Sequence, residues 1–139
     1  MVHIFICGEG AFMRNYILTD DVLCFTSNGY GTYVVEKNKD FYLSIDCLKL
    51  LKYGCNFYGN SYNMIIFFPT CTPSSKKCIW LAYNNITRYV KESNGTKIYF
   101  DNGKEMNIKV PYTTIDNQIT KCIKIEKYLN GIMRKTVEK

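Results

Sequence analysis

The sequence predicts an α+β fold, in which a mainly antiparallel sheet packs against a short central helix and a longer C-terminal helix. Three observations lead to it: an apolar run at 64–68 that Pro69 ends, short strand-like segments separated by Asn-Gly turns, and apolar residues at helical spacing after residue 114. At 139 residues the chain is long enough to bury one core. We therefore expect a single domain over 1–139, with frayed ends at 1–12 and 132–139.

The first predicted elements are two strands at 22–26 and 33–36, joined by a turn at 27–31. The turn contains Gly29-Tyr30-Gly31, which superficially resembles a phosphate-binding loop. No Gly-Lys-Ser and no Gly-x-Gly-x-x-Gly accompanies it, so we interpret it as a turn.

A short helix is predicted after Ser44, which has the side chain of an N-cap residue. Ile45, Leu48 and Leu51 would lie on one side of this helix, and Gly54 would end it. The helix is expected to cover one face of the sheet.

The apolar run at 64–68 is typical of a strand buried on both faces, because it is continuous and bounded by turn-forming residues. A polar turn at 73–77 follows and contains the adjacent cations Lys76 and Lys77. A strand at 78–83, with the chain's only tryptophan, completes the pair.

A meander is predicted next, with turns at Asn94-Gly95 and at Asp101-Asn102-Gly103. The alternation between these segments predicts one apolar face. The opposite face would carry Lys97, Tyr99, Asn107 and Lys109.

The longer helix is expected to start with Thr113 or Thr114 as its cap and to end near Asn130-Gly131. Its apolar side would contain Ile115, Ile119, Cys122, Ile123 and Leu129. Lys121, Lys124 and Lys127 repeat on another side, which is either a solvated face or a ridge that contacts phosphates.

Charge is unevenly distributed along the chain. Residues 1–48 carry a net charge of −3 and residues 49–139 a net charge of +9. The second part therefore fits a nucleic-acid surface, with a solubilising lysine face as the alternative. Only three of the eighteen cations are arginine, which argues against guanine readout in the major groove.

Seven cysteines are present without a Cys-x-x-Cys pair, and there is one histidine. No metal site or other cofactor is expected, and the thiols are expected to act as small core residues. Oxidation would bridge Cys71 and Cys78 across the basic turn, but a reducing cytosol argues against it. Without a usable histidine or a plausible carboxylate pair, we expect no enzyme.

The chain contains no run of about 20 apolar residues, and its first residues make a poor signal peptide. We therefore expect a cytoplasmic protein that neither enters a membrane nor takes a small-molecule substrate.

Several collinear motifs resemble the ComK family of competence transcription factors of Firmicutes. The similarity extends over roughly residues 14–130 and rests on Tyr53-Gly54-Cys55-Asn56-Phe57-Tyr58-Gly59-Asn60-Ser61-Tyr62, Ile65-Ile66-Phe67-Phe68-Pro69-Thr70, Cys78-Ile79-Trp80, Ile98-Tyr99-Phe100-Asp101-Asn102-Gly103-Lys104 and Asn117-Gln118. Of the residues that carry it, we expect Gly59, Phe68, Pro69, Trp80 and Gly103 to be structural.

The resemblance implies a cytoplasmic DNA-binding regulator that recognises paired A/T-rich boxes, largely through the minor groove, as dimers and higher oligomers. With the charge pattern, it makes double-stranded A/T-rich DNA the expected partner. The candidate contacts are Lys76, Lys77, Arg88, Lys91, Lys97, Lys104 and Lys109, with Asn60 as a base-edge contact.

The sequence departs from the family pattern in two places. Tyr62-Asn63-Met64 leads almost directly into Ile65, where typical members have a basic loop, and the family's C-terminal extension is missing after Lys139. Two alternatives therefore stay open: an interaction module of the same fold that pairs with a full-length relative and modulates it, and a small cysteine enzyme with a depressed thiol pKa. The operator sequence, the sign of regulation and the oligomeric state do not follow from the sequence.

Overall fold

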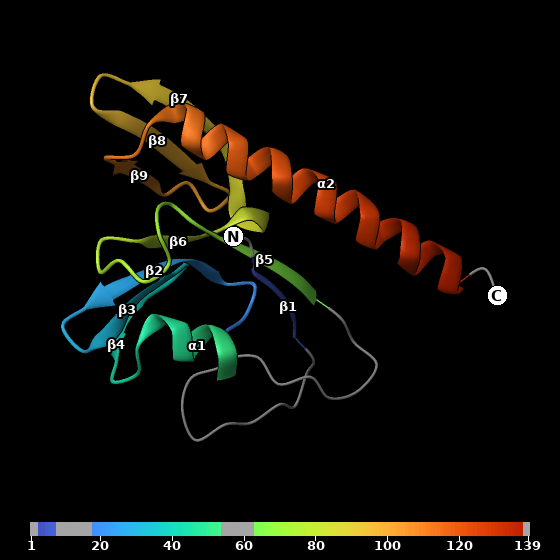
Figure 1. The fold of residues 1–139 in the computed structure, drawn as a ribbon, viewed down its shortest axis with the longest axis horizontal. Helices are drawn as coiled ribbons and strands as arrows, with labels where there is room; N and C mark the ends of the chain where they lie inside the picture. Colours follow the sequence, from blue (N-terminus) through green and yellow to red (C-terminus); the bar gives the residue numbers. More distant parts are fainter. Residues whose placement is uncertain (1–2, 8–17, 54–62, 138–139) are drawn as a thin grey trace.

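The computed structural model describes residues 3–7, 18–53 and 63–137, which form two antiparallel sheets, a short helix and a long C-terminal helix (Figure 1). The predicted α+β class is confirmed. The strands divide between a large and a small sheet, a division that the sequence patterns did not distinguish.

The large sheet has six strands in the order β1-β5-β6-β2-β3-β4, and every neighbouring pair is antiparallel. The strands are β1 (His3–Cys7), β2 (Val22–Asn28), β3 (Gly31–Glu36), β4 (Asp40–Leu43), β5 (Asn63–Pro69) and β6 (Ile79–Ala82). The predicted strands at 22–26, 33–36, 64–68 and 78–83 are thus confirmed. We had not predicted β1 or β4.

β5 is buried on both faces, as its continuous apolar run predicted. Ile65 and Phe67 pack in one core cluster with the residues around α1, whereas Ile66 and Phe68 pack in a second cluster with the small sheet and α2. All four side chains are fully buried. Burial of each of these side chains contributes roughly 1.5–3 kcal/mol to stability. Because successive side chains enter different clusters, β5 links both cores.

The short helix α1 (Cys47–Tyr53) starts later than predicted. Its N-cap is Asp46, whose Oδ1 accepts a hydrogen bond from the backbone N–H of Lys49 at 2.9 Å, so the prediction of Ser44 was wrong. The side of the helix that faces the core also differs from the predicted side, since it is formed by Cys47, Leu50 and Leu51. Leu48, which we expected inside, is 48% exposed.

The small sheet consists of β7 (Ile86–Glu92), β8 (Gly95–Phe100) and β9 (Glu105–Ile108). The β7–β8 turn is centred on Ser93 and Asn94, one position earlier than predicted, because Gly95 already pairs with Glu92. A Cβ atom at Gly95 would overlap the carbonyl oxygen of Ile108. This glycine is therefore required by the approach of β9 rather than by the turn.

The second turn of the small sheet is confirmed. Gly103 has a φ of +89°, and the backbone N–H of Phe100 donates to the carbonyl of Lys104 at 2.9 Å. The predicted alternation also holds, since Ile98 and Phe100 are buried while Lys97 and Tyr99 are only partly covered.

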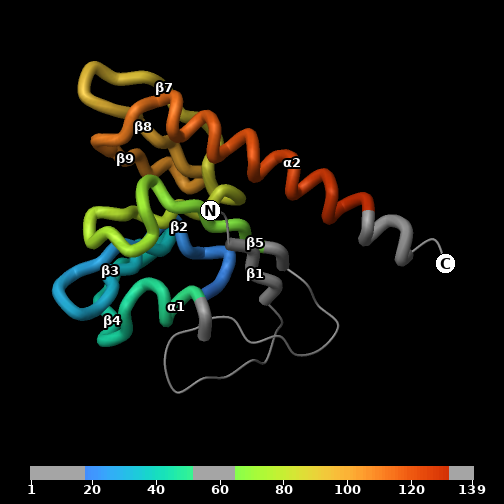
Figure 2. The backbone as a smooth tube through the Cα atoms, in the orientation of Figure 1, coloured from blue at the N-terminus to red at the C-terminus, as the bar shows by residue number. Residues whose placement is uncertain are grey.

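Helix α2 (Tyr112–Val137) begins directly after Pro111. The carbonyl of Pro111 accepts the first helical hydrogen bonds, from the N–H groups of Thr114 and Ile115, so neither predicted threonine cap is used. The helix also continues past Gly131, where we expected it to end. Ile115, Ile119 and Cys122 are buried as predicted, but Ile123 is 38% exposed because it lies on another side of the helix from Cys122 and Glu126, which face the sheets. The C-terminal end of α2 projects away from both sheets (Figure 2).

The link between the sheets is the short 3₁₀ helix η1 (Tyr83–Asn85). The side chain of Asn84 accepts a hydrogen bond from the N–H of Ile66 at 2.7 Å. The side-chain amide of Asn85 donates to the carbonyls of Asp20 and Val22, each at 2.7 Å. These bonds attach the corner between β6 and β7 to two strands of the large sheet.

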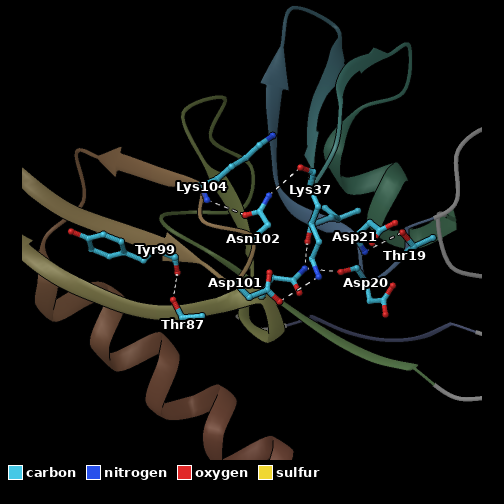
Figure 3. Close-up of polar contacts among 11 residues, drawn as sticks. Thr19, Asp20, Asp21, Lys37, Thr87, Tyr99, Asp101, Asn102 and Lys104 are labelled. Atoms are coloured by element: carbon cyan, nitrogen blue, oxygen red, sulfur yellow. Dashed lines mark hydrogen bonds and ion pairs between the residues drawn. The ribbon is translucent and has the colours of Figure 1, made fainter.

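The β8–β9 turn completes this connection (Figure 3). Asp101 forms an ion pair with Lys37 at 3.3 Å, and the Asn102 side chain donates to the Lys37 carbonyl at 3.0 Å. The ammonium group of Lys104 donates to the carbonyl of Glu36 at 3.2 Å. We call residues 36–37, 84–85 and 101–104 the sheet junction.

We expect Asn85→Ala to lower the free energy of unfolding by about 2–3 kcal/mol, because two backbone carbonyls lose their donor in a buried site. Urea denaturation would measure this as a lower midpoint with an unchanged slope. Asn94→Ala, in an exposed turn, is the control and should change stability by less than about 0.5 kcal/mol. Equal stability of the two variants would contradict the role given to Asn85.

Candidate nucleic-acid interface

Three turns project from one edge of the molecule, on the left in Figure 1: the β2–β3, β5–β6 and β7–β8 turns. We call this the turn edge and define it by residues 28–31, 71–78, 91–95 and 109. Lys76, Lys77, Lys91 and Lys109 lie on it, and all four are exposed. The structure thus places four of the predicted contact residues along one edge.

Lys76 and Lys77 are presented by a turn with defined internal hydrogen bonds. The N–H of Ser75 donates to the Thr72 carbonyl at 2.9 Å, and the N–H of Cys78 donates to the Ser75 carbonyl at 3.1 Å. The N–H of Lys77 also donates to Oγ of Ser75 at 3.1 Å. Because the backbone is held in this way, the two cations extend into solvent from a fixed base.

Tyr30 is the residue of this edge that sequence reasoning missed. Its side chain is 95% exposed at the tip of the β2–β3 turn, and the Lys76 ammonium lies 5.9 Å from its ring centroid. Gly29, with a φ of +63°, makes the turn, and a Cβ at Gly31 would overlap the Leu43 carbonyl. The sequence contains the Gly-Tyr-Gly pattern, but it does not predict that Tyr30 lies beside the basic turn at 73–77, because the two segments are far apart in the chain.

A hollow of about 350 Å³ separates the β2–β3 and β5–β6 turns, and Tyr30 and Lys76 both line it. A second hollow, of about 410 Å³, lies at the start of α2, where Lys91 and Lys109 form part of its wall together with Glu92. Both hollows open to solvent on the turn edge, beside its exposed lysines.

Arg88 and Lys97 lie elsewhere, on the face of the small sheet that points away from α2. The guanidinium carbon of Arg88 is 4.1 Å from the ring centroid of Tyr99, which is a stacking distance. Lys97 forms an ion pair with Glu105 at 3.3 Å, and this hydrogen bond raises the pKa of Lys97. The charge of Lys97 is thus partly compensated, whereas Arg88 keeps its charge beside an aromatic ring.

The remaining candidates are not on the turn edge. Lys104 belongs to the sheet junction, where its ammonium group donates a hydrogen bond to the backbone carbonyl of Glu36. Asn60 lies outside the described residues, as does Gly59 of the residues expected to be structural. Phe68 and Trp80 are fully buried, as expected of residues that support the core.

Helix α2 separates its charges between two sides. The carboxylates of Asp116 and Glu126 accept hydrogen bonds from the hydroxyls of Tyr89, at 2.7 Å, and Tyr83, at 3.2 Å. Burial and the adjacent carboxylate raise the pKa of Tyr83 to about 12. Lys121, Lys124 and Lys127 are exposed, so the solvent side of α2 is basic while its acids face the sheets.

Ion pairs neutralise few of the candidate cations. In the described part of the chain, the ion pairs are Lys37–Asp101, Lys39–Glu36 and Lys97–Glu105. The seven candidate cations are six lysines and Arg88, and of these only Lys97 belongs to one of the three ion pairs. The described cations of the turn edge therefore keep their charge available for an anionic partner.

Three of the described thiols, those of Cys24, Cys78 and Cys122, do not resemble catalytic nucleophiles. Burial raises the pKa of Cys24 and of Cys122 to about 12, and it also raises the pKa of Cys78. A nucleophilic cysteine needs the opposite shift. Within residues 3–7, 18–53 and 63–137 we also find no group of acidic, histidine or cysteine side chains arranged to hold a metal, and no helix that is apolar over a membrane-spanning length.

We expect Cys24 and Cys122 to react with iodoacetamide at least about a hundredfold more slowly in the native protein than in urea at pH 8, because burial blocks access to both thiols and raises the pKa of each to about 12. Their native rates should climb with pH toward 12. Cys71 is exposed and should react at a rate close to that in urea. Mass spectrometry of the labelled peptides measures all three, and fast native labelling of Cys24 or Cys122 would contradict this account.

Comparison with known proteins adds a family relationship. A family model described as "ComK protein" matches residues 62–133. The chain is also similar to the competence transcription factor of Bacillus subtilis (strain 168), with 24% identity over 111 aligned residues. That alignment covers 62% of this chain and 58% of the relative, so the chain spans less than two thirds of the relative's length. No solved structure matches.

Proposed function

The chain belongs to the ComK family, and on this premise we propose that it is a DNA-binding transcription regulator of the competence type. The matched residues 62–133 include every candidate cation, Lys76 to Lys109, but not Asn60. The segment that carries the family relationship is thus also the segment that carries the predicted contacts.

One observation carries this proposal: Lys76, Lys77, Lys91 and Lys109 are all exposed on the turn edge, and none is in an ion pair of the described residues. Such cations neutralise phosphates and release counterions, so affinity for DNA should fall steeply as salt rises.

The shape of the turn edge favours the minor groove of A/T-rich DNA. The major groove is wide enough for a helix, whereas the minor groove is about 6 Å wide and accepts a narrow turn or single side chains. The turn edge presents turns, with Tyr30 and Lys76 at their tips. A narrow A/T-rich groove also concentrates negative potential, which attracts cations placed in it. Arg88, stacked on Tyr99, is a further candidate to read groove width.

We further propose that the protein acts in the cytoplasm and binds its sites as a homo-oligomer. Paired A/T boxes would be matched by two copies of the turn edge. β4 and β9 lie at the edges of their sheets, and edge strands offer unpaired backbone groups to a second copy.

The second candidate function is an interaction module that no longer binds DNA and instead pairs with a full-length relative. Its supporting observation is β4, an edge strand that carries Tyr42 at 50% exposure. A partner strand added beside β4 would cover this side chain.

Charge reversal separates the two candidates. We expect Lys76→Glu with Lys77→Glu to weaken DNA binding at least about tenfold at 0.1 M salt and to reduce the slope of log affinity against log salt by about two. Fluorescence anisotropy with an A/T-rich duplex would measure both. The reason is the loss of two phosphate contacts on the turn edge.

The matched control is Lys124→Glu with Lys127→Glu, which changes the net charge equally on the solvent side of α2. It should leave the salt slope within about 0.5 of the wild-type value. If the control pair weakened binding more than the Lys76 and Lys77 pair, the interface would lie on α2. If the wild-type protein bound no DNA but captured a full-length relative, the interaction module would be the correct function.

A further inference from the structure

Cys71 and Cys78 face each other at the base of the β5–β6 turn. The pairing of β5 with β6 places Pro69 opposite Trp80, and the N–H of Thr70 donates to the Ile79 carbonyl at 3.0 Å. One more step in the same register places Cys71 opposite Cys78. The N–H of Ile79 in turn donates to Oγ1 of Thr70 at 3.0 Å, so the two strands are still joined directly before the two cysteines.

The side chains confirm that the two residues are in contact. Sγ of Cys78 donates to the carbonyl of Cys71 at 3.6 Å. Burial raises the pKa of the Cys78 thiol, and the neighbouring Cys71 thiol raises it further. Opposed residues of an antiparallel pair have Cα atoms about 4.5–5.5 Å apart, within the range of about 4.4–6.8 Å that disulfides adopt.

We propose that Cys71 and Cys78 form an oxidation site, a dithiol that a hydroperoxide converts to a disulfide across the base of the basic turn. In a reducing cytosol this disulfide would be transient, because cellular thiols reduce it once the hydroperoxide is consumed. This proposal does not depend on the proposed DNA binding. The disulfide would close a loop that contains Lys76 and Lys77.

The two thiols differ in their exposure to solvent, and this difference determines which of them reacts first with the hydroperoxide. Cys71 is exposed, whereas Cys78 is 2% exposed. The Cys71 thiolate attacks the hydroperoxide, whose O–O bond breaks, and becomes a sulfenic acid with release of water or an alcohol. The Cys78 sulfur then attacks the Cys71 sulfur, the S–O bond breaks, and the hydroxide leaves with the Cys78 proton as water. Two thiols are oxidised and one hydroperoxide is reduced.

The sequence supplies a direct assay for this bond. Lys-C cleaves after Lys76 and after Lys77, so it separates Cys71 from Cys78 unless a disulfide joins them. After treatment with hydrogen peroxide, we expect the peptides 53–76 and 78–91 to be recovered as one linked species that separates on reduction. Residues 53–76 also contain Cys55, so the linked species must be absent from Cys71→Ser.

A second measurement tests the consequence for the fold. The disulfide restricts the unfolded chain, so the peroxide-treated protein should melt about 5 °C higher than the reduced protein, and Cys71→Ser should show no rise. Cys71 is exposed, so this variant should fold normally. Peroxide treatment that leaves Cys78 free, whether Cys71 becomes a sulfinic acid, joins a second chain or stays reduced, would overturn the proposal. A linked species that persists in Cys71→Ser would also overturn it.

Discussion

The relative placement of the two sheets depends on hydrogen bonds made by two consecutive asparagines. Asn84 binds the backbone of β5, and Asn85 binds the segment that leads into β2 while its own carbonyl accepts the N–H of Asp101. Each partner is a backbone group that would otherwise lack a bond at the corner between the sheets. Together with the second core cluster, these bonds fix the direction in which β7 leaves β6 and the position of α2, which packs on the small sheet.

This arrangement also determines where charge reaches solvent. The small sheet turns Tyr83 and Tyr89 toward α2, where they bind the carboxylates of Glu126 and Asp116. Asp101 forms an ion pair with Lys37 in the sheet junction, and Glu105 forms one with Lys97. Acidic side chains in the second half of the chain are therefore largely satisfied inside the protein, and the lysines of the turn edge and of α2 determine the field outside.

Local patterns predicted the elements that depend only on neighbouring residues. The run that forms β5 and the glycine of the β8–β9 turn are examples, because continuous apolarity and a positive φ are local requirements. The packing of Gly95 against Ile108 was missed because it depends on a tertiary contact. The cap of α1 is local, but it was missed because Ser44 and Asp46 both have side chains that cap helices. The candidate site likewise has residues that the sequence predicts and relationships that only the fold shows. Charge counting found Lys76, but only the fold places Tyr30 beside it and commits Lys104 to the sheet junction.

The most direct test of the central claim, that the turn edge recognises A/T-rich DNA, compares two duplexes of equal length. One contains paired A/T boxes and the other is G/C-rich, and fluorescence anisotropy follows binding at several salt concentrations. The account predicts tighter binding to the A/T duplex, with a preference that persists as salt rises even though both affinities fall. Equal affinities that disappear together as salt rises would contradict it, because the lysines would then supply only a nonspecific field.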